Sequence, residues 1–522
     1  MSRRADTQTR LTPSQKRAFD LFKEGRNLLI TGKGGTGKSF LLREIRNYLE
    51  SQHRNILVCA PTGIAALNVG GATIHRTFRC PVRIVMPDEE FKPRHEPEGD
   101  ETQRRKAMDQ DPDPYEVILN ADVVIIDEIS MCRMDVFGYV ARTILHCKRP
   151  KQVILVGDFY QLPPVLTDHN KEKEAWNQIP EYTARIFAFE SEEWKRLGIT
   201  TIELQENMRQ KDEDYIKALD DIREGKPNFG VFRFNQKPDP DAVTLCPTND
   251  KAAEINREAL RKLIRKGNKS VTFMEELEGS VVSTSDKVLE KYRVTSKELT
   301  LCVDARVIIL VNAKKGEYVN GDTGTVTGIA EESVSIRLDS GRGITLGRKK
   351  WDIEEYQIVE EEDGRTGKKT KKPRLVTIGS ISQIPVKLAW AISVHKSQGQ
   401  TYDRCNVVCR FWTEGQMYVA LSRCRTLAGL RLLGTLEAKE LLYSEEVNAF
   451  MREAVAVNTV TEIRISAKSH EKTARNPKGA GRRIREDQTT VRKHVMRLTS
   501  QEKSIIEKLR ASEAFRKKIF SI

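Results

Sequence analysis

A glycine-rich loop between a predicted strand and a predicted helix constrains this fold more than any other feature. The residues GKGGTGKS, at 32–39, match the pattern G-x-x-x-x-G-K-[S/T] in full. They follow the apolar run NLLIT and precede the helical stretch FLLREIRNYLE, which is the context that the pattern requires. The sequence therefore predicts a phosphate-binding P-loop in a parallel α/β sheet.

The loop residues have distinct expected tasks. Glycines let backbone N–H groups converge on phosphates at a helix N-terminus, where the helix dipole favours anions. Lys38 is expected to contact the β- and γ-phosphates, and Ser39 to bind Mg²⁺. The remaining nucleotide-binding positions of the loop are Gly32, Gly34, Gly35, Thr36 and Gly37.

A second motif, VVIIDEIS at 123–130, supplies the acidic partner of a P-loop. Four apolar residues deliver Asp127 and Glu128 at the carboxyl end of a strand, where ligands bind in open parallel sheets. We expect Asp127 to hold Mg²⁺ through its water shell and Glu128 to activate the attacking water. Both motifs together indicate a nucleoside triphosphatase, although signal-transducing GTPases, transporters and kinases share the same two motifs.

The segment GDFYQLPPV, at 157–165, follows the next predicted strand. Gln161 is a candidate contact for the γ-phosphate. On spacing alone, a loop that is merely stiffened by its two prolines fits equally well.

Composition excludes several classes of protein. The 522 residues contain no run of about 20 apolar residues, which a membrane span needs, and the N-terminus lacks the apolar segment of a secretion signal. The nine cysteines include no Cys-x-x-Cys pair, which argues against a disulfide framework or a zinc module. These features favour a cytoplasmic protein.

The net charge of +14 is concentrated at the carboxyl end. Residues 464–522 carry 17 Lys and Arg against 6 Asp and Glu, a net charge of +11, which leaves +3 for residues 1–463. The nearly neutral charge of residues 1–463 therefore does not identify the ligand of that part of the chain. For the basic extension, DNA binding and a solvated surface are equally compatible with the sequence.

Alternating strand-like and helical runs predict an α/β fold with two parallel-sheet lobes. We expect the first lobe at 1–195, with an amphipathic helix over 133–147 and a small insertion at 81–116. The second lobe is expected at 196–455, opening with a strand and a long helix at 243–267. Short β-like runs between NGD, DSG and EDG turns predict a barrel or meander inserted at about 270–385. Residues 456–522 form a basic extension.

Four further motifs occur along the chain in addition to the P-loop, VVIIDEIS and GDFYQLPPV. They are APTGIAALNVGGATIH (60–75), LQENMRQ (204–210), VHKSQGQT (394–401) and YVALSRCR (418–425). Over residues 11–435 the series resembles superfamily 1 helicases, specifically the PIF family and its RecD-like relatives.

The resemblance implies two RecA-like lobes with ATP and Mg²⁺ in the cleft between them. It implies single-stranded DNA across both lobes, 5′-to-3′ translocation, and tailed or forked duplexes as substrates. Residues 81–116 fall where the family has a wedge-bearing subdomain, and 270–385 where it has a Src-homology-three-like barrel. Because the match begins near residue 11, without the long extension of many eukaryotic members, we expect a bacterial or phage enzyme associated with the nucleoid.

Site residues also follow from the resemblance. Arg209 and Arg423 match arginines that the second lobe directs at the γ-phosphate, and Gln15 matches a glutamine that binds the adenine edge. Gly399 is expected to couple the nucleotide state to DNA. Considered without the family, Gln15 is also an ordinary residue for the first turn of a helix.

Expected DNA contacts come from three matched segments: Thr62, Gly63, His75, His395, Lys396 and Ser397. The two histidines depend on the family match alone, because a lone histidine is more often structural. The charge-split segment at 360–374 is better explained as solvated surface. The basic extension is a candidate site for DNA or for replication and repair proteins.

Other functions remain open at this stage. A translocase with little unwinding activity, an RNA helicase of the same superfamily, and a DNA-binding adaptor that acts through its basic extension all fit the sequence.

Overall fold

The computed structural model describes residues 11–62, 65–66, 69–81, 83–89, 114–166, 171–290, 292–311, 313, 317–318, 322–362 and 369–454. It divides into two units, residues 1–199 with 204–444 and residues 200–203 with 445–522. The contacts discussed below all lie in the first unit. The predictions for Gly63, for most of 81–116 and for 456–522 fall outside the described residues. No described helix is long and apolar enough to cross a membrane.

The first parallel sheet consists of buried apolar strands in the order β3-β2-β4-β5-β1. Their bounds are β1 (Leu28–Gly32), β2 (Ile56–Ala60), β3 (Ala72–Thr73), β4 (Val123–Ile126) and β5 (Gln152–Val156). Because β1, β4 and β5 are neighbours and parallel, the loops at their carboxyl ends share one edge of the sheet. These loops are the P-loop, the Asp127–Glu128 pair and the segment GDFYQLPPV.

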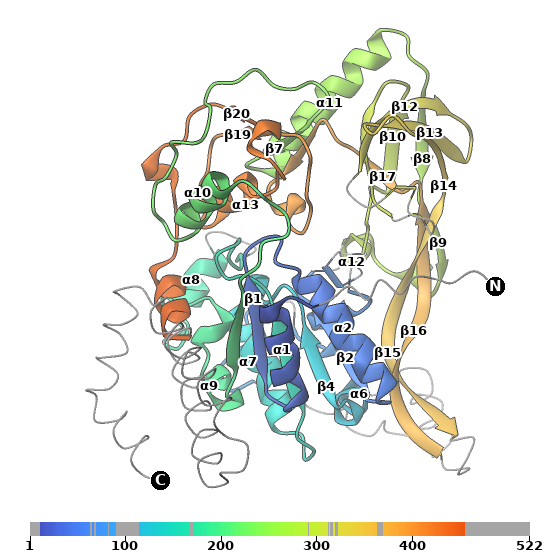
Figure 1. Cartoon of the computed structure of the whole chain (residues 1–522). Helices are drawn as coiled ribbons and strands as arrows, with labels where there is room; N and C mark the ends of the chain where they lie inside the picture. The colour runs from blue at the N-terminus through green and yellow to red at the C-terminus, as the bar shows by residue number, and fades with distance from the viewer. Residues whose placement is uncertain are drawn as a thin grey trace, which may run out of the picture. The chain divides into compact units, whose positions relative to one another are not determined.

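Helices accompany this sheet, and α1 and α2 lie beside β1 (Figure 1). The helices are α1 (Pro13–Lys23), α2 (Lys38–Ser51), α4 (Ile74–Thr77), α6 (Pro114–Asn120), α7 (Met134–Leu145), α8 (Lys171–Asn177) and α9 (Glu192–Leu197). This part of the chain also contains two short 3-10 turns, η1 (Ile129–Met131) and η2 (Ala188–Glu190). The strand β6 (Thr200–Leu204) follows α9.

Helix α7 differs from its prediction as an amphipathic helix, because it is buried from Met134 to Ile144. The polar side chains on it are paired inside the protein. Arg142 forms an ion pair with Glu193 at 2.8 Å and donates to the backbone carbonyls of Met86 and Glu89. Residues 83–89 and α9 thus cover the face that the sequence pattern assigns to solvent.

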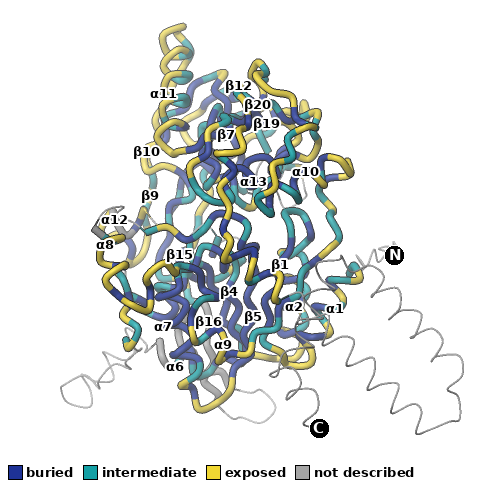
Figure 2. The backbone as a smooth tube through the Cα atoms, turned by 90° about the vertical axis from the view of Figure 1, so that its left-hand side faces the viewer, coloured by how far each residue is buried: buried dark blue, intermediate teal, exposed yellow. Residues whose placement is uncertain are grey.

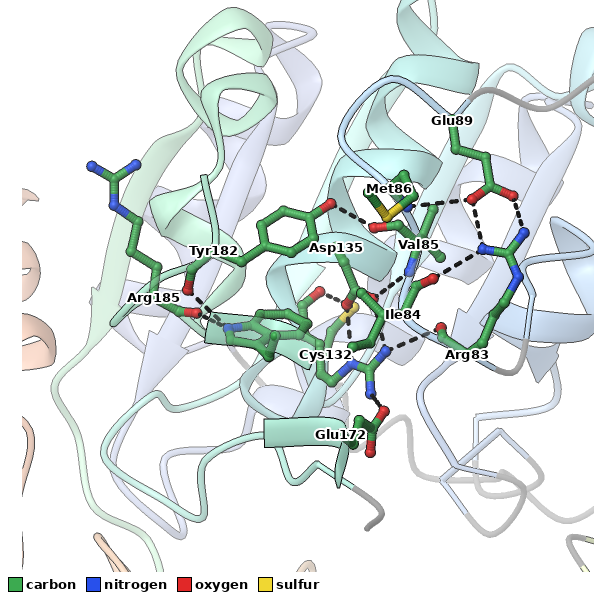
Figure 3. Close-up of polar contacts among 12 residues, drawn as sticks. Arg83, Ile84, Val85, Met86, Glu89, Cys132, Asp135, Glu172, Tyr182 and Arg185 are labelled. Atoms are coloured by element: carbon green, nitrogen blue, oxygen red, sulfur yellow. Dashed lines mark hydrogen bonds and ion pairs between the residues drawn. The ribbon is translucent and has the colours of Figure 1, made fainter. Parts of the chain in front are cut away.

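Figure 3 shows how residues 83–89, where the predicted first insertion begins, are attached to this helix. Arg133 forms an ion pair with Asp135 at 2.7 Å, and Asp135 accepts a hydrogen bond from the N–H of Val85 at 2.9 Å. The hydroxyl of Tyr182 donates to the carbonyl of Val85 at 2.6 Å. Buried polar groups therefore fix the backbone of this segment from both sides.

The second parallel sheet has the order β18-β7-β19-β20. Its elements are α10 (Glu213–Arg223), β7 (Val243–Cys246), α11 (Asn249–Arg265), β18 (Ala391–Ser393), η4 (His395–Ser397), β19 (Cys405–Val408), α13 (Gln416–Leu421), η5 (Leu427–Gly429), β20 (Leu430–Leu433) and η6 (Ala438–Glu440). The strand and long helix predicted at 243–267 are confirmed. Helices α10 and α13 pack into one apolar cluster with β7 and β19, whereas α11 is largely exposed (Figure 2).

Antiparallel sheets occupy the chain between β7 and β18. Strands β14-β13-β12-β11-β17 form one sheet, β15-β16-β9 a second, and β10-β8 a third. Their bounds are β8 (Ser270–Met274), β9 (Glu276–Gly279), β10 (Glu298–Cys302), β11 (Arg306–Ile309), β12 (Thr323–Ile329), β13 (Ser333–Leu338), β14 (Gly343–Gly347), β15 (Lys349–Glu362), β16 (Lys369–Gln383) and β17 (Val386–Leu388), with η3 (Ser280–Ser283) and α12 (Asp286–Leu289).

In the charge-split segment at 360–374, residues 360–362 belong to β15 and residues 369–374 to β16, which pair with each other. The register places Glu360 opposite Lys371 and Glu362 opposite Lys369. The two strands form the long hairpin at the right of Figure 1, next to α6.

Candidate active site

The P-loop requires glycine for both its backbone conformation and its close contacts. Gly35 and Gly37 have φ angles of 90° and 80°, in the left-handed region. A Cβ atom at Gly35 would lie 2.3 Å from Cβ of Arg209, and one at Gly37 would lie 2.5 Å from Nε2 of Gln15. Two residues that the sequence associates with the nucleotide, Gln15 and Arg209, therefore lie directly against the loop.

Lys38 begins helix α2, and its ammonium group binds back onto the loop. Nζ donates to the carbonyls of Gly32 at 2.5 Å and of Lys33 at 3.1 Å. Loss of hydration lowers the pKa of Lys38, while the negative charges of Asp158 and Glu128 oppose that shift. Ser39 follows in the first turn of α2 and is exposed.

Asp127 and Glu128 follow β4 and are partly buried. Burial, followed by the charge of Glu128, raises the pKa of Asp127 to about 7. Burial also raises the pKa of Glu128, against the opposing charges of Lys38 and Arg423. Glu128 adopts a left-handed φ of 50°, a strained conformation of the kind found at functional sites. A cation beside these carboxylates would relieve their mutual repulsion.

Three side chains from the second-sheet region contact these loops. The hydroxyl of Tyr418 accepts a hydrogen bond from the N–H of Gly34 at 3.2 Å. The amide of Gln398 donates to Glu128 at 3.3 Å, and Asp220 on α10 forms an ion pair with Lys33. No sequence-based prediction covered Tyr418, Gln398 or Asp220, although the first two lie inside the motifs YVALSRCR and VHKSQGQT.

Arg209 lies at the phosphate-binding face of the P-loop. A Cβ atom at Gly34 would lie 2.9 Å from its Nη1, and the same nitrogen donates to the carbonyl of Ser422 at 3.2 Å. Burial, followed by the charge of Arg423, lowers the pKa of Arg209 to about 10. Among the residues that the structure describes, no carboxylate pairs with this guanidinium, which is therefore suited to binding an anion.

Arg423 is buried at the end of α13, with 1% of its surface exposed. Its guanidinium donates to the carbonyls of Val419 at 2.9 Å, Gln400 at 3.3 Å and Ser397 at 3.4 Å. Burial lowers its pKa, and the charge of Glu128 acts in the opposite direction. The structure thus brings both predicted arginines to the P-loop and acidic-pair region.

A buried ion pair joins the GDFYQLPPV loop to α10. Asp158 is fully buried, and its carboxylate accepts from Nη2 of Arg223 at 3.0 Å. The guanidinium of Arg223 lies 4.2 Å from the ring centre of Tyr160. Neither Asp158 nor Arg223 was predicted from the sequence, because nothing in a single sequence pairs residues 65 positions apart.

Gln161 and Gln15 are both buried beside the loops where the sequence predicted them. The N–H of Gln161 binds the carbonyl of Asp158, and its own carbonyl would lie 2.4 Å from a Cβ atom at Gly415, which caps α13. The amide of Gln15 donates to the carbonyl of Thr36 at 3.1 Å. Gln15 also completes the capping box of α1, which is the structural alternative for this residue. Gly399 follows η4 in a left-handed conformation with φ of 78°.

The predicted DNA contacts fall into two groups. Thr62 and His75 follow β2 and β3 of the first sheet, whereas His395, Lys396 and Ser397 form η4 of the second. Lys396 is exposed. Ser397 is fully buried, and its hydroxyl donates to the carbonyl of Val394 at 2.7 Å.

Comparison with known proteins gives a consistent assignment. A family described as PIF1-like helicase matches residues 10–229. The chain is 30% identical over 441 residues to an ATP-dependent DNA helicase Pif1 of Bdellovibrio bacteriovorus, covering 81% of this chain and 88% of that protein.

Solved structures are similar over most of the chain. Bacteroides sp. Pif1 in complex with ADP-AlF4 matches with a TM-score of 0.69 and 28% identity, over 85% of this chain and 97% of that one. Bacteroides Pif1 bound to single-stranded DNA matches with a TM-score of 0.56 and 29% identity, over the same shares of the two chains.

Proposed function

The chain belongs to the PIF1-like helicase family, and on that premise we propose that it is an ATP-dependent DNA helicase moving 5′-to-3′ along single-stranded DNA. One observation carries this proposal. The phosphate-binding loops of the first sheet are bonded to residues of the second-sheet region, through Gly34 with Tyr418 and Glu128 with Gln398. A nucleotide held at these loops contacts both sheets, so its hydrolysis alters how they meet.

ATP and Mg²⁺ fit the residues at this site. The proposed ligands of Mg²⁺ are the Ser39 hydroxyl and the Asp127 carboxylate, which are the hard oxygen donors that this ion prefers. The pKa of Asp127, raised to about 7, supports a nearby cation as the natural counter-charge. No group of three or more metal-ligating side chains occurs among the described residues, which agrees with an ion held largely by nucleotide phosphates and water. When bound, Mg²⁺ neutralises phosphate charge.

The protein's own groups account for hydrolysis. In this proposal Glu128 orients the attacking water and accepts its proton, while Gln161 contacts the γ-phosphate. Lys38, released from the loop carbonyls that it now binds, neutralises the β- and γ-phosphates. Arg209 and Arg423 neutralise charge that develops on the transferred phosphoryl group. Gln15 binds the adenine edge, and Gly399 links this site to the DNA contacts.

DNA is proposed to cross the carboxyl edges of both sheets. The proposed contacts are Thr62 and His75 beside the first sheet and His395, Lys396 and Ser397 beside the second. Gly63, which lies outside the described residues, completes the set. Because the hydroxyl of Ser397 is buried and bonded to the carbonyl of Val394, Ser397 is proposed to act through the shape of its loop. Tailed and forked duplexes are the proposed substrates, and the Bacteroides relative bound to single-stranded DNA supports this ligand class.

The flanking segments have proposed roles of their own. We assign the segment at 81–116 to a wedge-bearing subdomain and 270–385 to a barrel-like one. The antiparallel sheets between β8 and β17 support the second assignment. The basic extension at 456–522 is a proposed site for DNA or for replication and repair proteins in a nucleoid-associated, cytoplasmic enzyme.

ATP hydrolysis with and without single-stranded DNA tests the proposal. Stimulation by DNA and not by RNA of the same sequence is expected, together with loss of hydrolysis in Lys38→Ala. Equal stimulation by RNA would indicate an RNA helicase. Hydrolysis that survives in Lys38→Ala would overturn the assignment of the active site.

A further inference from the structure

Trp412 presents an unusually exposed indole beside the 3-10 turn η4. Its exposed fraction is 46%, compared with 3% for Trp176 and 6% for Trp194. Its ring stacks with the imidazole of His395, with centroids 6.1 Å apart and planes at 25°. A large apolar surface is therefore left in water next to a residue that the sequence associates with DNA.

The chain around Trp412 holds the indole in place. The backbone N–H of Trp412 donates to the side-chain amide of Gln416 at 3.0 Å, and the indole N–H donates to the carbonyl of Pro247 at 3.4 Å. Gln416 is fully buried and donates to the same carbonyl at 2.9 Å. The exposure of Trp412 is thus a property of a fixed loop.

This loop lies where a parallel sheet binds ligands. Trp412 follows β19, Pro247 follows β7, and His395 follows β18, and these three strands are neighbours in the second sheet. Ligands in open parallel sheets bind outside the carboxyl ends of the strands. The indole therefore belongs to the binding edge of the sheet.

Lys396 supplies positive charge at the same edge, and Lys387 lies on β17, the strand that precedes β18 in the chain. Lys396 is exposed on η4, and Lys387 lies half-buried on β17. Burial, followed by the charge of Lys396, lowers the pKa of Lys387 to about 8, while Glu290 acts in the opposite direction. The positive charge of Lys396 therefore acts on Lys387, and an anion beside either ammonium group would oppose that effect.

We propose that Trp412 is a stacking platform for one base of single-stranded DNA, with Lys387 and Lys396 binding the flanking phosphates. The proposal rests on the proposed function, and it adds Trp412 and Lys387 to the residues that the family motifs supply. An aromatic face accepts any base, which suits an enzyme that moves along DNA irrespective of sequence. The neighbouring lysines favour a nucleic-acid strand over an apolar protein surface as the occupant.

Intrinsic fluorescence of the full chain during titration with oligothymidylate tests the stacking. Base stacking on the exposed indole is expected to quench its emission. The quench is expected to disappear in Trp412→Phe and to persist in the matched control Trp351→Phe. Trp412→Ala is expected to weaken binding about 5- to 150-fold, since stacking contributes ~1–3 kcal/mol per base.

A salt titration tests the phosphate contacts separately. Lys387→Gln is expected to weaken binding and to reduce the slope of log K against log salt by about 0.7, the value for one phosphate contact on a single strand. An unchanged slope would remove Lys387 from the proposal.

The outcomes separate this proposal from the proposed function. A quench that persists in Trp412→Phe, or wild-type affinity in Trp412→Ala, overturns the stacking even if DNA stimulates hydrolysis. Absence of DNA binding by the wild-type chain overturns both proposals. Should Trp412→Ala unfold, as judged by thermal melting, the conservative Trp412→Phe variant decides the question alone.

Discussion

The hydroxyl of Tyr418, on helix α13, accepts a hydrogen bond from the backbone N–H of Gly34 in the P-loop at 3.2 Å. The N–H groups of a P-loop are the donors that bind phosphate. Tyr418 therefore occupies one of these donors, and a phosphate bound at Gly34 would compete with its hydroxyl. An arriving phosphate must replace this contact, which couples nucleotide binding to the position of α13.

Tyr418→Phe should bind ATP more tightly, because the hydroxyl no longer competes for the N–H of Gly34. A typical hydrogen bond contributes ~0.5–1.5 kcal/mol, so the gain should be at most about tenfold. Titration with a non-hydrolysable ATP analogue measures this change. Weaker binding in the variant would mean that the hydroxyl assists the nucleotide instead of competing with it.

Arg423→Gln should lower kcat about 10³- to 10⁵-fold, the range for arginines that neutralise a transferring phosphoryl group. Steady-state hydrolysis at saturating DNA measures the change. Arg425→Gln is the matched control, because Arg425 lies two positions away and forms an exposed ion pair with Asp403. Similar losses in both variants would contradict a specific role for Arg423.

Arg223→Met should destabilise the chain by about 3–5 kcal/mol, because it leaves the fully buried Asp158 charge without its partner. Urea unfolding measures the difference. Lys217→Met on the same helix removes an exposed pair with Asp221 and should change little. If the two variants unfold alike, the buried pair is not a significant source of stability.

DNA affinity should fall as pH rises from 7 to 9.5, because Lys387 has a pKa of about 8 and loses its charge in this range. The loss should be up to about tenfold, the effect of ~1.5 kcal/mol for a charged hydrogen bond. Lys387→Arg stays charged and should bind equally at both pH values. Fluorescence anisotropy of a labelled oligonucleotide provides the measurement.

The pH dependence of folding stability, measured without DNA, provides a second test of the pKa of Lys387. The pKa of Lys387 is lower in the folded state than the ordinary value of 10.5, so the unfolded chain binds more protons between pH 8 and 10.5. Its contribution therefore makes the fold more stable as pH rises through this window. Lys387→Gln should reduce that increase, whereas an unchanged pH profile would contradict the shifted pKa.

Contiguous motifs made much of the site predictable. The P-loop and the Asp127–Glu128 pair are short segments whose residue types follow from phosphate and Mg²⁺ chemistry, and the alternation of apolar and helical runs indicated parallel sheets. The β-rich stretch between β8 and β17 was also predictable from local sequence, because Gly and Asp residues mark the turns between its strands.

Contacts between distant segments were not predictable. Asp220 meets Lys33 across 187 positions, and Tyr418 meets Gly34 across 384. No local pattern distinguishes these residues from surface charges or core aromatics. The burial of α7 was missed for a related reason, since ion pairs such as Arg142 with Glu193 hide charged residues that a periodicity argument assigns to solvent.

Strand displacement tests the central claim, that ATP hydrolysis at loops shared by both sheets moves the chain 5′-to-3′ along DNA. Matched duplexes carry either a 5′ or a 3′ single-stranded tail, and Lys38→Ala and Arg423→Gln serve as controls. The account predicts ATP-dependent displacement from the 5′-tailed duplex alone, absent in Lys38→Ala and strongly reduced in Arg423→Gln. Displacement from the 3′-tailed duplex, or from neither while DNA still stimulates hydrolysis, would contradict it.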